Sequence, residues 1–252
     1  MEHKELQALR EYSVIKSNDL IQRSRYQLST QEQKIILYLI SKIKPDDDDF
    51  KLYDFQIKDF CEVCGIDETN GQNYANLKIT IKNLADKSVW VTLNDGRETV
   101  VRWIERPYID KKCGKIQIKL DDLMKPYLLE LQKQFTKYNL YFILAMKSKY
   151  SLRIYEILKS YENMGCCEYD IEQLKKMIFA EQYTQISDFR KKVINIAVQE
   201  INDFGDVSVK YNFIKQGRAF NKIQFLIKTK NNLDERVETF KKIEEQLANG
   251  QK

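Results

Sequence analysis

The fold is decided by residues 187–227, a stretch in which a helical pattern gives way to two alternating ones. The stretch begins SDFRKKVINIAVQEIN (187–202), turns at Gly205-Asp206 and continues as VSVKYNF (207–213) and NKIQFLI (221–227). In the first run, apolar residues recur three and four positions apart, which predicts an amphipathic helix. In the other two they alternate with polar residues, which predicts two strands joined by a turn at residues 215–218. A helix followed by such a hairpin is typical of the second half of a winged-helix domain.

Positive charge is concentrated in the same segment. Between Ser187 and Lys230 there are nine Lys and Arg residues and four Asp and Glu residues, and this local excess of five equals the net charge of the whole chain, +5. A basic helix and hairpin are typical of proteins that bind the phosphates of duplex DNA. The segment therefore predicts a winged helix that binds DNA.

At 100° per residue, the helix over 187–202 has an apolar side and a polar side. The predicted core stripe is Phe189, Val193, Ile196 and Ala197. The opposite side, which also includes Asn202, suits the major groove, where Asn and Gln pair with adenine and Arg and Lys reach guanine or phosphate. Ser187 is expected near the helix start, where its hydroxyl accepts a backbone amide as a cap. The predicted DNA-binding residues are Ser187, Arg190, Lys191, Lys192, Asn195 and Gln199 on the helix, and Lys215, Arg218 and Lys222 on the hairpin.

The composition favours a soluble protein with one large domain or two of ordinary size. The chain has 252 residues, of which 43% are hydrophobic and 31% charged, and only three are proline. No apolar run has the length of a membrane span, and the first residues lack a secretory hydrophobic region. We therefore expect a cytoplasmic protein without a membrane partner. Five scattered cysteines indicate reduced thiols rather than a disulfide framework.

The same order of elements occurs twice along the chain. The first copy opens with a capping box, Ser29-Thr30-Gln31-Glu32, in which a hydroxyl and a carboxylate satisfy the first free amides of a helix. Each copy then reads helix, short strand, helix, helix, hairpin. The predicted elements of the first copy are helices 33–43, 57–64 and 73–87, a strand at 50–53 and a hairpin through Asn94-Asp95-Gly96; those of the second are helices 151–161, 170–178 and 187–202, a strand ending at 169–170 and the basic hairpin.

We therefore predict an α+β fold of two tandem winged-helix domains related by an internal repeat. The predicted boundaries are 15–125 for the first domain, 126–230 for the second, which is the main DNA-reading module, and 231–252 for a C-terminal helical tail. Residues 121–141 have helical spacing and form the predicted join, whose apolar character indicates that the domains pack together. One face of the tail is apolar and is expected to dock on the second domain, or alternatively on a host replication protein.

The third helix of the first domain has a less basic outer face. Leu77, Ile81 and Leu84 are predicted to point inward. We expect mainly phosphate contacts from the outer face, which position a protein on DNA without reading its sequence. The alternative is that the first domain is chiefly an interaction or dimerisation platform. The candidate contacts are Asn76, Lys78 and Lys82 on the helix and Arg97 in the hairpin.

The sequence offers little for catalysis or metal binding. Rolling-circle nickases hold a metal with paired histidines, and the single histidine of this chain is His3. Cys61 and Cys64 have CxxC spacing, but a structural zinc site needs a second pair, so core packing is the better explanation. No glycine-rich phosphate loop is present. We therefore expect no enzyme activity, no cofactor and no metal.

Five stretches in the same order resemble the initiator proteins of iteron-containing, theta-replicating plasmids. They are LSTQEQK (28–34), FTKY (135–138), KSKYSLRIYEIL (147–158), the helix 189–202 with its final EIN, and KQGR with IQF (215–218 and 223–225). The resemblance implies two winged-helix domains that bind repeated sites at an origin, and a monomer that initiates while a dimer represses. It also implies opening of an adjacent AT-rich region and recruitment of host replication proteins such as the helicase or the host initiator.

The predicted function is that of a plasmid replication initiator. It would bind repeated double-stranded DNA sites (iterons), and would repress its own promoter as a homodimer in equilibrium with the monomer. The alternative is a winged-helix transcriptional repressor with no initiator role, which would share the fold and the contacts. A third class, a nickase or primase, would reveal itself by strand scission or primer synthesis.

Overall fold

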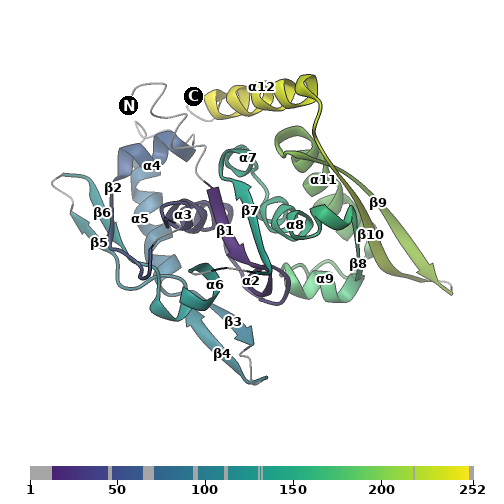
Figure 1. Ribbon diagram of the computed structural model, residues 1–252, viewed down its shortest axis with the longest axis horizontal. Coiled ribbons are helices and arrows are strands. Elements are labelled where there is room, and N and C mark those ends of the chain that lie inside the picture. Colours follow the sequence, from purple (N-terminus) through teal and green to yellow (C-terminus); the bar gives the residue numbers. More distant parts are fainter. Residues whose placement is uncertain are drawn as a thin grey trace.

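The computed structural model describes residues 13–44, 47–64, 71–92, 96–110, 113–129, 131, 133–217 and 219–249. Two groups of helices and strands lie side by side, with β1 (Ser13–Ser17) and β7 (Phe135–Asn139) between them (Figure 1). These two strands pair antiparallel, with Ser13 opposite Asn139. After β1 the chain forms α2 (Asn18–Gln22), which packs against a helix of the second group. The two halves therefore pack together, as the apolar join predicted.

The first group begins at the predicted capping box. The Ser29 hydroxyl accepts a hydrogen bond from the backbone N–H of Glu32 (3.3 Å), and the Glu32 carboxylate accepts one from the N–H of Ser29 (2.6 Å). These bonds start α3 (Thr30–Ile40), whose residues from Ile35 to Ile40 are all buried. The rest of the predicted order follows, with its hairpin turn at Asn94 and Asp95 outside the described residues. The elements are β2 (Tyr53–Gln56), α4 (Ile57–Cys64), α5 (Gly71–Ala85), β3 (Ser88–Thr92) and β4 (Glu98–Arg102).

The strands of the first half do not pair as those of the second half do. Strand β2 pairs with β6 (Lys115–Ile118), and β5 (Tyr108–Asp110) completes a sheet of order β2-β6-β5, while β3 and β4 form a separate ribbon. In the second half the corresponding strand pairs with the hairpin itself, in the order β8-β10-β9. The repeat thus holds for the order of elements but not for strand pairing, because an additional hairpin supplies the partner of β2.

The join between the halves is only briefly helical. A 3₁₀ turn (Asp122–Met124) capped by Asp121 leads into α6 (Lys125–Leu128), which ends at Leu129 in an extended conformation, and β7 begins at Phe135. The predicted helical spacing over 121–141 therefore fails beyond α6. Residues 135–139 form a strand because they make backbone hydrogen bonds with β1, more than 100 residues earlier in the chain. The spacing of apolar residues within 121–141 carries no information about such a partner strand.

The second group contains every predicted element of its copy. The turn after its third helix needs Gly205, because a Cβ there would lie 2.7 Å from the carbonyl oxygen of Ile201. The elements are α8 (Lys149–Ser160), β8 (Cys166–Asp170), α9 (Ile171–Met177), a helix made of α10 (Ile186–Phe189), a π-helical turn (Arg190–Ile194) and α11 (Asn195–Phe204), and the hairpin β9 (Val207–Gln216) and β10 (Ala219–Thr229).

The π-helical turn changes which side chains of the third helix face the core. Such a turn contains one extra residue and rotates every later side chain by about 100°. Phe189, Val193 and Ala197 are fully buried as predicted, but Ile194 is buried too, whereas Ile196 is 40% exposed. The prediction of Ile196 as a core residue is therefore wrong, because regular helical spacing makes no allowance for the extra residue.

Helix α12 (Leu233–Asn249) lies across α7 (Tyr141–Leu144) and α11 (Figure 1). Ile243 and Leu247 are buried, and the ring of Phe240 lies 5.3 Å from that of Tyr141. Leu233 and Val237, at the start of the helix, are 73% and 57% exposed. The tail thus docks on its own chain, but through the later part of its apolar face only. Among the described helices, none is long and apolar enough to cross a bilayer.

A cluster of buried charges lies where the two halves meet. Lys16 on β1 donates to Oε1 of Glu156 on α8 (2.7 Å), and the Tyr138 hydroxyl donates to the same oxygen (2.5 Å). Arg153, also on α8, donates to the carbonyl oxygen of Ile21 (2.6 Å). All four of these side chains are at most 3% exposed. The single carboxylate of Glu156 thus faces two cations, Lys16 and Arg153, whose Nη1 lies 3.8 Å from Oε2 of Glu156, and it links β1, β7 and α8.

Candidate nucleic-acid interface

The outer face of the α10–α11 helix carries most of the second-domain residues predicted to contact DNA. Because of the π-helical turn, the helical positions of Ser187, Lys191, Asn195 and Gln199 lie along one side, opposite the buried stripe. All four are exposed, as is Lys192, whose ammonium lies 3.5 Å from Asp188 in a surface ion pair. The face thus presents amide groups beside positive charge, a combination suited to a groove lined by phosphates.

Ser187 does not cap the helix. The helix starts one residue earlier, at Ile186, and the residue at its N-cap is Gln185, which makes no side-chain capping bond. The hydroxyl of Ser187 consequently belongs to the first helical turn, where it is exposed. The predicted capping role is wrong, but the residue remains on the outer face.

The hairpin β9–β10 adds positive charge next to this helix. Lys215 is exposed, with its ammonium 5.1 Å from the ring centroid of Phe220. Lys222 donates a hydrogen bond to Glu168 on β8 (2.7 Å), and this bond raises the pKa of Lys222. Arg218 lies outside the described residues. Lys215 therefore carries an exposed charge near the hairpin tip, whereas the charge of Lys222 is shared with a carboxylate.

Tyr211 on β9 is a site residue that the sequence did not reveal. Its hydroxyl accepts a hydrogen bond from Nε of Arg190 (3.2 Å) and donates one to Oδ1 of Asn195 (2.5 Å). The guanidinium of Arg190 also lies 5.4 Å from the ring centroid of Phe213. The one available signal was the strand pattern, since Tyr211 and Phe213 continue the core-facing side of β9 beyond Val209.

Two neighbouring polar residues of α11 have structural partners instead. Glu200 accepts hydrogen bonds from the backbone N–H groups of Lys147 and Ser148 at the start of α8 (both 3.1 Å). Asn202 accepts from the N–H of Val209 (2.6 Å) and donates to its carbonyl oxygen (3.0 Å). The predicted outward orientation of Asn202 is therefore wrong, because its amide completes the backbone pairing of β9.

Replacing Glu200 and its neighbour Gln199, one at a time, should show which of the two side chains stabilises the fold. Glu200→Ala leaves the N–H groups of Lys147 and Ser148, just before α8, without their acceptor and is expected to lower the free energy of unfolding by about 1 kcal/mol, the typical contribution of such hydrogen bonds. Gln199→Ala, at an exposed position, is expected to change it by less than about 0.5 kcal/mol. Urea unfolding measures both values, and equal stabilities for the two variants would contradict the assigned role of Glu200.

In the first half, only two of the four candidate DNA contacts are exposed. On α5, Leu77, Ile81 and Leu84 are buried as predicted. Lys82 is exposed and lies 3.9 Å from Asp86. The remaining candidates are Asn76 and Lys78, which are half-buried, and Arg97, which is exposed.

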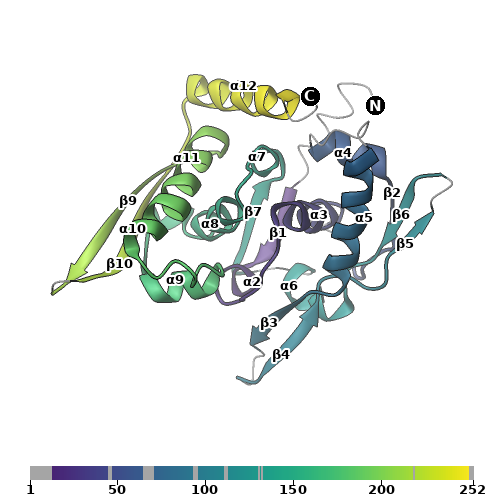
Figure 2. The same cartoon turned by 180° about the vertical axis from the view of Figure 1, so that it is seen from behind.

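Both third helices lie on the same side of the molecule. Figure 2 shows α5 in one half and α10–α11 in the other on the near side, with the hairpin β3–β4 directed toward the lower edge and β9–β10 toward the left. One duplex running along this side would meet both helices. The arrangement therefore permits the two domains to contact a single site together.

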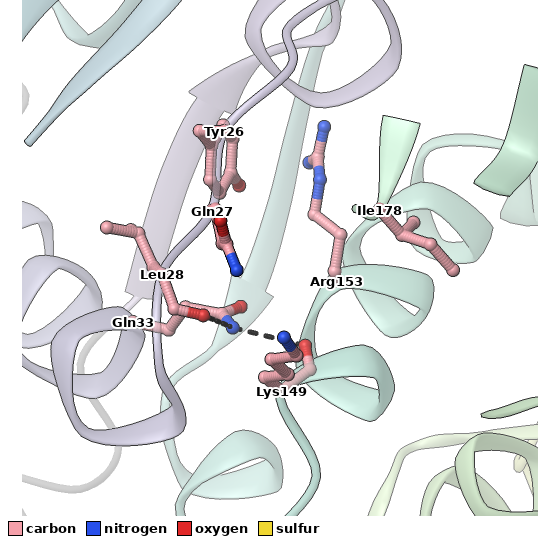
Figure 3. A pocket seen from close by; sticks show the side chains of 7 residues that line it. All are labelled: Tyr26, Gln27, Leu28, Gln33, Lys149, Arg153 and Ile178. Carbon is pink, nitrogen blue, oxygen red and sulfur yellow. Dashed lines mark hydrogen bonds between the residues drawn. The ribbon is translucent and has the colours of Figure 1, made fainter. Parts of the chain in front are cut away.

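A small pocket opens between the halves (Figure 3). Its volume of about 10 Å³ is close to the space that one water molecule needs and is far below that of a nucleotide site. It is lined by Tyr26, Gln27, Leu28, Gln33, Lys149, Arg153 and Ile178.

The described residues form no group of three His, Cys, Asp or Glu side chains that could hold a metal ion. Cys61 of the CxxC pair is buried in the core, as predicted, while the side chain of Cys64 lies outside the described residues.

Comparison with known proteins identifies the class to which this architecture belongs. Residues 13–159 match the family described as Initiator Replication protein, WH1, and residues 170–227 match that described as Initiator Rep protein, WH2. The chain therefore belongs to the family of replication initiator proteins with two winged-helix domains, which confirms the predicted family and fold class. The first match extends beyond residue 125, and the domain boundary at 125/126 remains a prediction.

Individual relatives agree with this assignment. A curated replication initiation protein of Escherichia coli is 24% identical over 236 residues, covering 89% of this chain and 72% of that protein. The crystal structure of the Pi initiator protein in complex with iteron DNA superposes with a TM-score of 0.72 at 18% identity, covering 88% of this chain and 99% of that one. At this identity the superposition shows a shared fold.

Proposed function

We propose that this chain initiates plasmid replication by binding repeated duplex DNA sites at the origin. Family membership supplies the class of function, and the related Pi initiator was crystallised with iteron DNA. The observation that carries the proposal is the exposed row of Lys191, Asn195 and Gln199 beside a basic hairpin. A helix with this row suits the major groove, where the hairpin would lie against the flanking phosphates.

The residues divide by the kind of DNA contact that each suits. Lys191, Asn195 and Gln199 would face base edges, since they occupy the middle of the exposed row. The other residues of the second domain would contact phosphates and fix the register. These are Ser187, Arg190, Lys192, Lys215, Arg218 and Lys222, joined from the first domain by Asn76, Lys78, Lys82 and Arg97.

The partners beyond DNA follow from the family. We propose that the initiator recruits host replication proteins such as the helicase or the host initiator, and that a homodimer in equilibrium with the monomer represses the promoter of the chain itself. A DNA-binding role in the cytoplasm without enzyme activity fits this family. Incubating the protein and Mg²⁺ with supercoiled origin plasmid tests the last point, because a covalent protein–DNA adduct would contradict it.

The decisive experiment is replication of an origin fragment that lacks its own initiator gene. Supplied in trans, the wild-type chain should maintain the fragment in cells, whereas a simple repressor should not. Footprinting on the same fragment should reveal directly repeated protected sites, each of roughly two helical turns if both domains bind. Protection of a promoter without replication would favour the repressor.

Lys82→Ala tests the role of the first domain. If Lys82 contacts a phosphate, the variant should bind every DNA sequence more weakly and by a similar factor, and the salt dependence of log K should fall by about one unit. Filter binding at several salt concentrations measures this slope. An unchanged slope would favour the alternative in which the first domain is an interaction platform.

A further inference from the structure

The hydrogen bonds of Tyr211 have a fixed direction. The Nε–H of Arg190 can only donate, so the Tyr211 oxygen accepts there (3.2 Å). The Tyr211 proton is then available for Oδ1 of Asn195, which lies at 2.5 Å. Because arginine stays charged at every ordinary pH, this direction does not change.

The orientation of the Asn195 amide follows from this chain of bonds. With Oδ1 held toward the hairpin, the NH₂ group of Asn195 is the part of the amide left for an external partner. The aromatic neighbours keep the Tyr211 ring in place: Phe213 lies 5.6 Å away edge-on and Phe225 lies 6.5 Å away. Asn195 thus presents hydrogen-bond donors from an exposed position on the outer face.

We infer that Tyr211 is a positioning residue that determines base specificity, by holding Asn195 as a donor toward the acceptors of a guanine edge. This inference rests on the proposed DNA-binding role of the α10–α11 helix. In the major groove guanine presents two acceptors, N7 and O6, whereas the paired contact of asparagine with adenine also needs the amide oxygen. The Tyr211 hydroxyl takes one lone pair of that oxygen and holds it toward the hairpin, which disfavours the adenine contact. The general pairing of Asn with adenine expected from the sequence does not include this bond, which joins residues of two different elements.

The test compares base preference at each position of an origin repeat for the wild-type protein, Tyr211→Phe, Asn195→Ala and the double variant. Tyr211→Phe keeps the ring and removes only the hydroxyl. The wild type should prefer guanine at one position by roughly tenfold. Tyr211→Phe should reduce that preference to below about threefold there, leave the other positions unchanged and keep the salt slope. The double variant should match Asn195→Ala, because the hydroxyl acts through that residue.

The outcomes separate this inference from the proposed function. Wild-type preferences that persist in Tyr211→Phe at every position would overturn the role of Tyr211 while leaving DNA binding intact. Uniform weakening at all positions would also overturn it, since a purely structural role predicts that pattern. A wild-type protein that shows no preference for any origin repeat would instead refute the proposed function. Thermal unfolding of Tyr211→Phe verifies that the variant is folded.

Discussion

Glu156→Gln is expected to lower the free energy of unfolding by about 3–5 kcal/mol, the cost typical of removing one partner from a buried ion pair. Glu156 and Lys16 are each 1% exposed, and their side chains are joined by a 2.7 Å hydrogen bond. The substitution keeps the size of the side chain but leaves the Lys16 ammonium buried without a counter-charge. Urea unfolding of the variant and the wild type measures the difference.

A second substitution distinguishes lost charge balance from lost packing. Lys16→Met added to Glu156→Gln removes the uncompensated ammonium, so the double variant should regain part of the lost stability, the rest reflecting Arg153, whose Nη1 lies 3.8 Å from the Glu156 carboxylate in the wild type. Arg153 keeps its carbonyl partners in both proteins, at Ile21 and Ser24. A double variant less stable than the single one would show that the cost comes from packing.

The pKa of Glu156 predicts how the stability of the protein depends on pH. Burial opposes the ionisation of Glu156, but the charges of Lys16 and Arg153 outweigh it and hold its pKa below the ordinary value of 4.5. A lowered folded-state pKa stabilises the protein above the unfolded-state pKa, and this contribution is lost as the pH falls through the folded value. The wild type should therefore lose more stability than Glu156→Gln on acidification below about pH 5.

Lys191→Ala is expected to weaken binding to origin repeats by about 1–3 kcal/mol, because it removes a cation from the middle of the exposed row. A gel-shift titration against the footprinted repeats measures the change, and random-sequence DNA shows how much of it is specific. The protein should remain as stable as the wild type, since exposed substitutions change stability by less than about 0.5 kcal/mol.

Lys241→Ala provides the matched control for this charge change. Lys241 is an exposed lysine on α12, outside the proposed interface, so its loss alters the net charge equally. Its effect on repeat binding should be small, and any effect should be general electrostatics that fades at higher salt. Equal loss of affinity in both variants would show that Lys191 contributes only net charge, which would contradict its place in the groove.

The sequence by itself determined the elements of the two repeats and their order. The capping box at Ser29, the inward face of α5 and the strand alternation of β9–β10 are all signals between near neighbours, which the helical and strand periods encode directly. The outer row of Lys191, Asn195 and Gln199 was predictable for the same reason. It stays on the outer side of the helix whether or not the π-helical turn is present.

The tertiary structure alone decided which distant residues meet. Nothing local could show that β2 pairs with β6, that residues 135–139 form a strand against β1, or that Glu200 binds the backbone just before α8 while Asn202 binds β9. The π-helical turn that exposes Ile196 and the hydrogen bond from Tyr211 to Asn195 were likewise not predictable from local sequence patterns. These features depend on packing and hydrogen bonds between different elements, whereas periodicity reports only which side of one segment is apolar.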